Sequence, residues 1–294
     1  MNKRIQTTGN SNNMPDSLTI EGKHYALLGT QKSGASVYRG ISSFLRIGPA
    51  HAIQRDLAFH RRMEQAKFPV APILSEGTYG AEAYFIEQSF GERSFSAMFN
   101  EEYAHNGAIA DVNFDNYIVC IGSFFKSQMT TRTTFKESDL RFAIRLDQLA
   151  DEFPHLRNVL DVTFKKTMEQ LQIFPGALTH GDLTAANAYP TGVIDLEDSF
   201  VGPIGFDIVS ALISKEWTPE GDYEPSPFFR FTGDQQRRYF EYFDALCLEN
   251  NIPKISEAVQ AFSFCRGVWL CAGMAEWPKT QKWRVEKLVH EHLA

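Results

Sequence analysis

The sequence contains 294 residues, of which 43% are hydrophobic and 22% are charged, and its formal net charge is -7. This length suffices for one large domain or two lobes, and the composition excludes a disordered or fibrous protein. No cluster of lysine and arginine indicates a nucleic-acid partner, and no apolar run is as long as a membrane span. Residues 1–17 are polar and lack the apolar centre of a signal peptide, so we expect a flexible tail on a cytoplasmic protein.

Strand-like runs separated by turns fill the first ninety residues. They occur over 24–29, 36–40 and 42–48, with a turn containing glycine and serine over 30–35. Apolar residues at helical spacing follow over 50–67, and two more strand-like runs surround a glycine between residues 72 and 90. We therefore predict a domain over 18–90 that contains five antiparallel strands and one helix.

After residue 91 the periodicity becomes helical. Apolar residues form one helix face over 114–129 and another over 156–171, and helical patterns recur over 239–248, 255–273 and 283–293. We predict a larger, mainly helical domain over 91–294, which makes the fold class α+β. A β-rich lobe joined to a helical lobe is expected to leave a cleft between them, with the join at residues 87–91 as its back wall.

The cysteines indicate neither a disulfide framework nor a metal site. They show no Cys-x-x-Cys spacing, and each lies in an apolar segment, at Cys120, Cys247, Cys265 and Cys271. We expect these thiols to be buried in the core.

Acidic residues are concentrated in one segment of the helical domain, THGDLTAANAYPTGVIDLED over 179–198. A short hairpin that turns at residues 190–192 would bring Asn187 and Asp195 side by side. One amide oxygen and one carboxylate suit a magnesium ion that keeps waters and phosphate oxygens as its other ligands. Asp182 would face the same pocket, where it could orient a hydroxyl and take its proton. The alternative is a polar hairpin whose acids cap a helix over 197–212.

The spacing within residues 180–195, His-Gly-Asp, four residues, Asn, and then Ile-Asp, resembles the active site of the protein-kinase-like small-molecule kinases. That family includes the aminoglycoside phosphotransferases and the choline kinases. The resemblance covers most of the chain, because the sheet domain, its helix and the helical domain follow one another in the family's order. It implies a protein-kinase-like two-lobe fold, with ATP and Mg²⁺ as cofactors and a small hydroxylated molecule as the phosphate acceptor.

The resemblance also implies a role for each residue of the motif. Asp182 would be the catalytic base or the group that orients the acceptor hydroxyl, and Asn187 and Asp195 would be the magnesium ligands. His180 would hold the loop by hydrogen bonds, and Asp207, in the segment GPIGFDIVSAL, would support the catalytic loop.

The nucleotide would be bound by the first hairpin, whose small residues could cover its phosphates, and by the backbone over 86–89. Arg46 occupies the place of the usual phosphate-binding lysine on the third predicted strand, and Asp56 on the predicted helix would pair with it. The nucleotide-binding candidates are Arg46, Gly34, Ser33, Ser36, Val37, Lys32, Glu87, Ser89 and Ile194.

Arginine in place of lysine leaves a second hypothesis open, because a guanidinium is not equivalent to an ammonium group at a phosphate. The alternative is a catalytically weak, kinase-like protein that binds a nucleotide or another ligand. A protein kinase is disfavoured, since no DFG triplet or APE-like segment follows Asp195.

The acceptor would be a sugar, an amino sugar, an aminoglycoside or an amino alcohol, and the oligomeric state stays open. The segment over 214–230 is long and irregular, and its acids could receive an amine-bearing substrate or form a solvated loop. These acids are Glu216, Glu220, Asp222 and Glu224. Glu197 and Asp198 would assist a second metal ion or the acceptor, or else cap a helix, and Trp217 would stack on a sugar ring or lie in the core.

Overall fold

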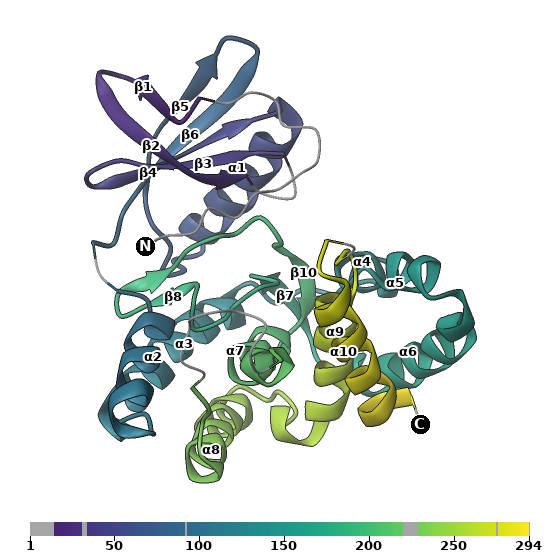
Figure 1. Ribbon diagram of the computed structural model, residues 1–294. Coiled ribbons are helices and arrows are strands. Elements are labelled where there is room, and N and C mark those ends of the chain that lie inside the picture. Colours follow the sequence, from purple (N-terminus) through teal and green to yellow (C-terminus); the bar gives the residue numbers. More distant parts are fainter. Residues whose placement is uncertain (1–14, 31–33, 92, 220–228, 275, 294) are drawn as a thin grey trace. The chain divides into compact units, whose positions relative to one another are not determined.

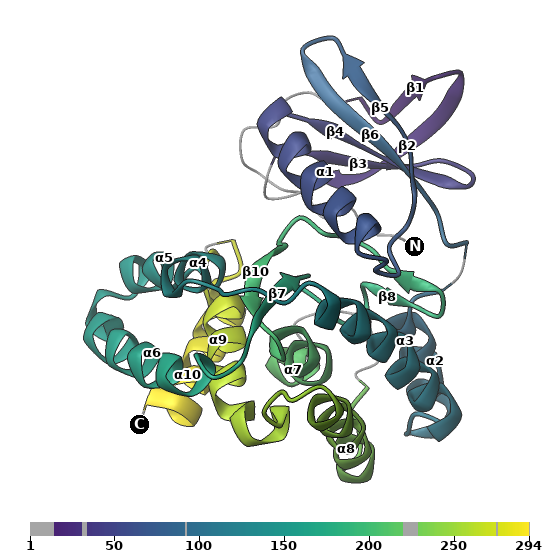
Figure 2. The ribbon, with the colours of Figure 1, turned by 180° about the vertical axis from the view of Figure 1, so that it is seen from behind.

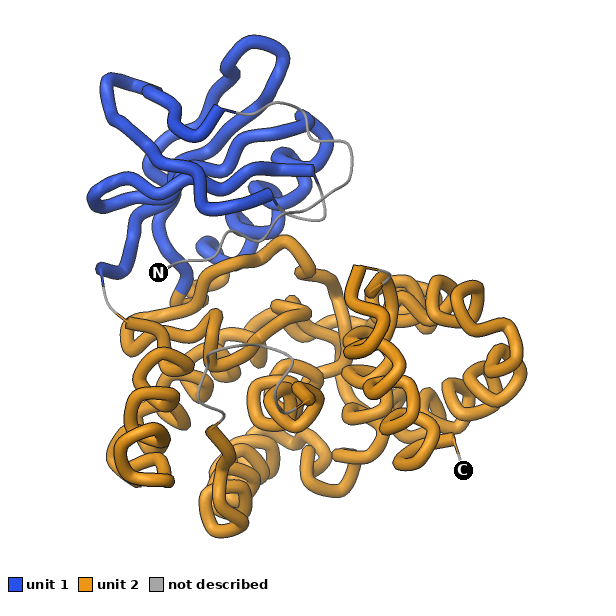
Figure 3. Tube along the Cα trace, in the orientation of Figure 1, with its two compact units in different colours: residues 1–65, 70–92 blue, residues 66–69, 93–294 orange. Residues whose placement is uncertain are grey.

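The computed structural model describes residues 15–30, 34–91, 93–219, 229–274 and 276–293. The chain forms two compact units, which Figure 3 distinguishes by colour. The sheet unit comprises residues 1–65 and 70–92, and the helical unit comprises residues 66–69 and 93–294.

The sheet unit is a six-stranded antiparallel sheet with the strand order β1-β2-β3-β4-β6-β5, and one helix packs on it (Figure 1). Its elements are β1 (Ser17–Ile20), β2 (Lys23–Thr30), β3 (Ser36–Arg39), β4 (Ser43–Gly48), α1 (Ala50–Gln65), β5 (Ile73–Tyr79) and β6 (Glu82–Gln88). The predicted helix and five strands are confirmed, but the sheet has a sixth strand. β1 was missed because it has only four residues and directly follows the polar tail, although Leu18 and Ile20 alternate with exposed neighbours.

The two faces of this sheet bury different side chains. One face carries a cluster that includes Tyr25, Tyr38, Leu45 and Ile86. On the other face Phe85 packs with Ile53 of α1, so the apolar stripe of the helix covers the sheet (Figure 2).

The helical unit contains the remaining longer helices and two short sheets. Its helices are α2 (Phe95–Asn106), α3 (Asp111–Thr130), α4 (Glu137–Ala143), α5 (Leu146–Glu152), α6 (Arg157–Leu171), α7 (Phe206–Ile213), α8 (Gly233–Glu249), α9 (Val259–Cys271) and α10 (Pro278–Leu288). Short helical turns are η1 (Pro154–Leu156), η2 (Ser214–Trp217), η3 (Ile255–Ala258) and η4 (Val289–Leu293). The strands are β7 (Gly176–Thr179), β8 (Ala188–Tyr189), β9 (Gly192–Val193) and β10 (Phe200–Pro203).

The helices predicted from apolar spacing are confirmed, with shifted ends. The segment predicted over 114–129 is α3, and the one predicted over 156–171 is α6. α8 begins at Gly233, before the predicted 239, because Thr232 and Gln235 form a capping box that starts the helix ahead of its first buried aromatic. The helix over 197–212, which the alternative hypothesis required, is not present: β10 occupies 200–203, and α7 starts only at Phe206.

α7 lies at the centre of the helical unit, and two buried tyrosines fix it. The Tyr117 hydroxyl of α3 donates to the Ala211 carbonyl oxygen at 2.8 Å, and the Tyr239 hydroxyl of α8 donates to the Ile208 carbonyl oxygen at 2.9 Å. Burial raises the pKa of both phenols well above its usual value, so they stay neutral donors. α9 packs on the other side of α7, and α7 is therefore held between α3, α8 and α9.

All four cysteines are buried thiols, as predicted. Burial raises the pKa of Cys247 and of Cys271 to about 12, which keeps both thiols protonated and unreactive. Within the part of the chain that the structure describes, no helix is long and apolar enough to cross a bilayer.

Candidate active site

The loop that follows β7 begins with a close backbone approach. Gly181 has φ +85°, and a Cβ atom at this position would lie 2.1 Å from the carbonyl oxygen of Asp198. Only glycine fits both the left-handed conformation and this contact. The glycine of the His-Gly-Asp motif therefore lets the loop lie against the segment that leads into β10, which pairs with β7.

Asp207, in the first turn of α7, anchors this loop. Its Oδ2 atom accepts from the backbone N–H of His180 at 2.8 Å and from Gln128 Nε2 of α3 at 2.8 Å, and its Oδ1 atom accepts from the Gly181 N–H at 3.0 Å. Burial raises the pKa of Asp207, while the neighbouring His180 and Arg266 side chains and the two backbone N–H groups lower it. The contacts agree with the support role predicted for Asp207, and Gln128 is an addition that the sequence analysis missed.

His180 is fully buried and bonds through both ring nitrogens. Its Nδ1 atom accepts from the Asp182 backbone N–H at 3.3 Å, so the ring proton is on Nε2, which donates to the Ile194 carbonyl oxygen at 2.9 Å. His180 thus ties the loop to the far strand of the β8–β9 hairpin, in keeping with the structural role predicted for it.

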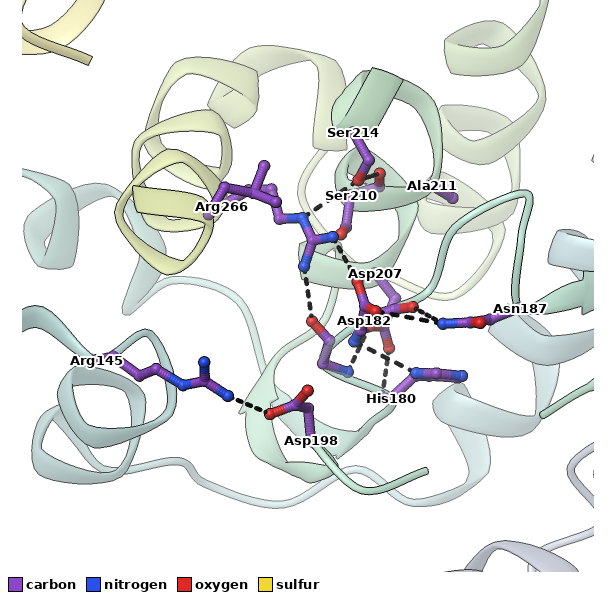
Figure 4. A network of polar contacts seen from close by, with 12 residues as sticks. Arg145, His180, Asp182, Asn187, Asp198, Asp207, Ser210, Ala211, Ser214 and Arg266 are labelled. Atoms are coloured by element: carbon purple, nitrogen blue, oxygen red, sulfur yellow. Dashed lines mark hydrogen bonds and ion pairs between the residues drawn. The ribbon is translucent and has the colours of Figure 1, made fainter. Parts of the chain in front are cut away.

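Asp182 is held by an arginine that the sequence analysis missed. Arg266 of α9 donates from Nη2 to Asp182 Oδ1 at 2.5 Å, from Nη1 to the Gly181 carbonyl oxygen at 3.2 Å, and from Nε to Ser214 Oγ at 3.2 Å (Figure 4). The guanidinium also lies over the ring of Trp269, 4.2 Å from its centre. Only 2% of the Arg266 side chain is exposed, against 26% for Asp182. A single arginine within the apolar run FSFCRGVWL was the available signal, because a buried guanidinium needs an anionic partner.

The β8–β9 hairpin brings the two predicted magnesium ligands to one end of the same turn. Ala188 pairs with Val193, and the Ile194 N–H donates to the Asn187 carbonyl oxygen at 3.0 Å. Asn187 therefore lies opposite Ile194, and Asp195 is the next residue. Asp195 has φ +69°, a left-handed conformation that aspartate tolerates better than most residues.

The donor set at this end of the hairpin fits a magnesium ion. Asn187 Nδ2 donates to the Asp182 carbonyl oxygen at 2.9 Å and to Asp182 Oδ2 at 3.3 Å, which turns its Oδ1 atom away from Asp182. An amide oxygen and a carboxylate are hard oxygen ligands, as Mg²⁺ requires. Among the described residues no group of three His, Cys, Asp or Glu side chains could hold a metal ion, so a site here would need ligands from elsewhere, such as phosphate oxygens.

A pocket of about 230 Å³ opens beside Asp182 in the helical unit. Its described lining includes Arg266, Lys215, Trp269 and Phe229. The pocket gives the half-buried carboxylate of Asp182 room to meet a small molecule.

The three predicted substrate-binding residues do not line this pocket. Asp198 Oδ1 accepts from Arg145 Nη2 at 2.8 Å, and Glu197 lies beside it in the same turn. Trp217 is a core residue: its side chain is only 1% exposed and stacks on His292. Trp269 of α9 is the pocket's tryptophan instead.

In the sheet unit, Arg46 is buried beside the carboxylate of Glu87, and its pairing with Asp56 stays a prediction. Its Nε atom donates to Glu87 Oε1 at 3.3 Å, and Glu87 Oε2 lies 3.9 Å from His60 Nδ1. Asp56 is buried one helical turn before His60 on α1. Arg46 lies opposite Val37 on the neighbouring strand, so the two residues share a face of the sheet.

The other nucleotide-binding candidates are spread along the sheet unit. Gly34 has φ +85°, Ser36 is buried with its hydroxyl 3.3 Å from that of Thr30, and Ser89 Oγ accepts from the Gly91 N–H. Lys32 and Ser33 lie outside the described residues. Ile194 belongs to the helical unit, where its carbonyl oxygen binds His180.

The chain resembles solved kinase structures along most of its length. It superposes on the aminoglycoside-3'-phosphotransferase of type VIII with a TM-score of 0.52 and 15% identity, covering 88% of this chain and 96% of that one. A thermostable mutant of aminoglycoside phosphotransferase APH(4)-Ia, in a ternary complex with ADP and hygromycin B, gives a TM-score of 0.54 and 12% identity, covering 91% and 93%. A choline/ethanolamine kinase family protein from Mesorhizobium loti gives 0.56 and 13%, covering 90% and 87%.

These similarities confirm the predicted α+β, protein-kinase-like fold. No curated protein matches the sequence. The model of the phosphotransferase enzyme family (APH) matches residues 32–244, which include the whole segment from His180 to Asp207. The chain belongs to the phosphotransferase enzyme family.

Proposed function

We propose that this phosphotransferase transfers the γ-phosphate of ATP, with Mg²⁺, to a hydroxyl group of a small molecule. Residues 18–90 would bind the nucleotide, and residues 91–294 would supply the catalytic groups and bind the acceptor. The observation that carries the proposal is the Asp182 carboxylate, held by Arg266 and Asn187 at the edge of a pocket of about 230 Å³.

Asp182 would orient the acceptor hydroxyl and receive its proton. Oδ1 is engaged by Arg266 at 2.5 Å, whereas the hydrogen bond of Oδ2 among the described residues is the long 3.3 Å contact with Asn187, so Oδ2 would be the atom that meets the hydroxyl. As the acceptor oxygen forms its bond to the γ-phosphorus, the bond from phosphorus to the bridging oxygen of ADP breaks and the hydroxyl proton passes to Oδ2. The products are ADP and a phosphate monoester.

Asn187 and Asp195 would hold the magnesium ion. Bound Mg²⁺ would neutralise charge on the phosphates. The hydrogen bond from Asn187 Nδ2 to Asp182 supports this assignment, because it leaves the Asn187 amide oxygen free to face a cation while linking the metal ligand to the base.

Arg46 would contact the phosphates, with Gly34, Ser36 and Val37 on the covering hairpin. Support comes from the position of Arg46 on β4, opposite Val37, and from its hydrogen bond to Glu87, since a buried guanidinium held by a carboxylate is a fixed cation. Lys32 and Ser33 would add contacts from the tip of that hairpin, and the backbone near Ser89 would contact the base, with Ile194 as an apolar neighbour.

Release of ADP measured against a panel of sugars, amino sugars, aminoglycosides and amino alcohols tests the proposal. At least one acceptor should stimulate ADP release, and Asp182→Asn should reduce that stimulated rate by about 10²–10⁴-fold, the usual contribution of a general base. Asn keeps an oxygen for Arg266, so the variant should fold. Asp234→Asn, on the exposed first turn of α8, is the matched control and should leave the rate unchanged.

The alternative of a catalytically weak binding protein has a different signature. It would give nucleotide binding that persists in Asp182→Asn, but no acceptor would stimulate ADP release by the native chain. Stimulation that is equal in the native chain and in Asp182→Asn would refute the assignment of the base.

A further inference from the structure

The described lining of the pocket beside Asp182 carries more positively charged than negatively charged side chains. Its described lining contains three cations, Lys215, Arg266 and Arg284, and one carboxylate, Asp182. Of the acids that could receive an amine, Glu216 is exposed outside the lining, and Glu220, Asp222 and Glu224 lie outside the described residues. The described wall of the pocket is therefore cationic.

Two of the three cations are already committed to the protein. Arg266 uses its donors on Asp182, Gly181 and Ser214, and its charge is balanced by the Asp182 carboxylate. Arg284 donates from Nε to the Trp217 carbonyl oxygen at 2.7 Å and from Nη1 to that of Leu270 at 2.9 Å. Both guanidinium groups thus brace α9 and its surroundings.

Lys215, the third cation, contacts an aromatic ring. It lies in η2, directly after α7, and its ammonium group is 4.9 Å from the centre of the Phe229 ring. It is half-buried, and burial lowers its pKa. Within the described ranges no carboxylate lies at ion-pair distance from it. A partly desolvated ammonium group that has no carboxylate beside it among the described residues is stabilised by an anion that enters next to it.

The size of the pocket also limits its ligand. Sites for drug-sized molecules are typically about 300–1,000 Å³, whereas this pocket is about 230 Å³. Trp269 and Phe229 give it aromatic walls. The described part of the pocket has room for about one ring, and a polycation would meet Lys215 there with charge repulsion.

We propose that the acceptor is a small hydroxylated anion, whose carboxylate or phosphate group is bound by Lys215 while its hydroxyl meets Asp182. This inference rests on the proposed function, since it places the acceptor beside the proposed base. It differs from the amine-bearing acceptor, which was one of the two hypotheses for the acidic segment over 214–230.

A set of sugars matched except for charge tests the inference. Glucose, glucuronate, glucose 6-phosphate and glucosamine, together with glycerate and glycerol, are compared by calorimetric binding and by ADP release. At least one anionic member should bind at least tenfold more tightly than its neutral and amino counterparts. Lys215→Gln should weaken that binding by about 10- to 100-fold, and the same variant should raise the acceptor KM more than it lowers kcat.

Lys282→Gln, on the exposed face of α10, is the matched control and should change neither quantity. Lys215→Glu sharpens the test, because it should reverse the charge preference toward glucosamine.

The inference is overturned if no anionic member binds more tightly than its counterparts, or if Lys215→Gln binds the anions as well as the native chain does. Turnover of neutral or amino acceptors that depends on Asp182 but not on Lys215 would sink this inference and leave the proposed function standing. Binding of the anions that depends on Lys215, without any ADP release, would support this inference and contradict the proposed function.

Discussion

Each unit of the molecule buries an arginine against a carboxylate, and the two pairs differ in what covers the acid. In the sheet unit Arg46 and Glu87 come from adjacent strands, and each side chain is only 6% exposed. In the helical unit Arg266 is equally buried, but Asp182 is 26% exposed and faces a pocket. The covered pair fixes a guanidinium within the sheet unit, whereas the pair with one open side fixes a carboxylate where a ligand can reach it.

The largest change in the free energy of unfolding is expected when the covered pair of Arg46 and Glu87 is broken. Glu87→Gln removes the carboxylate beside the buried Arg46 guanidinium and should lower the free energy of unfolding by about 3–5 kcal/mol. Glu76→Gln breaks an exposed pair with Arg61 in the same unit and should change it by less than about 1 kcal/mol. Denaturant unfolding measures both variants, and equal losses would contradict the distinction between covered and open pairs.

The next largest loss of stability is expected where the backbone of Gly181 contacts the carbonyl oxygen of Asp198. Gly181→Ala adds a Cβ atom 2.1 Å from the Asp198 carbonyl oxygen at φ +85°. The conformation costs about 1–2 kcal/mol and the overpacking about 1–3 kcal/mol, so a loss of about 2–5 kcal/mol is expected in thermal or denaturant unfolding.

Gly107→Ala measures the conformational part of that loss alone. Gly107 has φ +69°, but a Cβ atom there would meet nothing within 4 Å. This variant should therefore lose only the conformational part, and an equal loss in the two variants would show that the contact with Asp198 is unimportant.

The open pair itself should affect turnover more than stability. Arg266→Met frees the Asp182 carboxylate to rotate, and misplacement of a catalytic group by about 1 Å costs about 10²-fold in rate, or about 2.7 kcal/mol. We expect kcat to fall by this factor with the nucleotide KM unchanged, and Arg266→Lys to recover part of it. Arg237→Met, on the exposed face of α8, is the control. A fall in stability with no change in kcat would make Arg266 a packing residue only.

The smallest of these effects is expected at Asp207. Asp207→Asn keeps the shape but places an NH₂ group against one of the N–H donors of His180, Gly181 or Gln128. A buried donor left without an acceptor costs about 1–3 kcal/mol, which thermal unfolding of the variant would detect. Asp234→Asn is again the control, and a neutral result at Asp207 would mean that other contacts hold the loop.

Local patterns predicted much of the fold and the motif, but not the partners that orient it. Apolar spacing predicted α1, α3 and α6, and the short hairpin between Asn187 and Asp195 follows from its turn residues. The spacing could not reveal that Arg266 reaches Asp182 from 84 positions downstream. It also missed the four-residue β1, whose sequence carries too few periods to count.

The side chains that line the pocket beside Asp182 could not be predicted from local patterns either. The acids near residues 216–224 are adjacent in sequence and left an amine-bearing substrate as one hypothesis, whereas the described lining takes its cations Lys215 and Arg266 from η2 and α9. The side chains that face a cavity depend on how helices distant in sequence pack together. The composition of a single loop does not determine this packing.

The position of Arg266 also orders events during synthesis of the chain. Asp182 leaves the ribosome 84 residues before its guanidinium partner, an interval of roughly 4–17 s at ordinary translation rates. The family match ends at residue 244, so a nascent chain of that length already contains every matched segment and still lacks the arginine that holds Asp182. The contact between Arg266 and Asp182 would thus form late in synthesis, only after α9 has left the ribosome and packed on the helical unit.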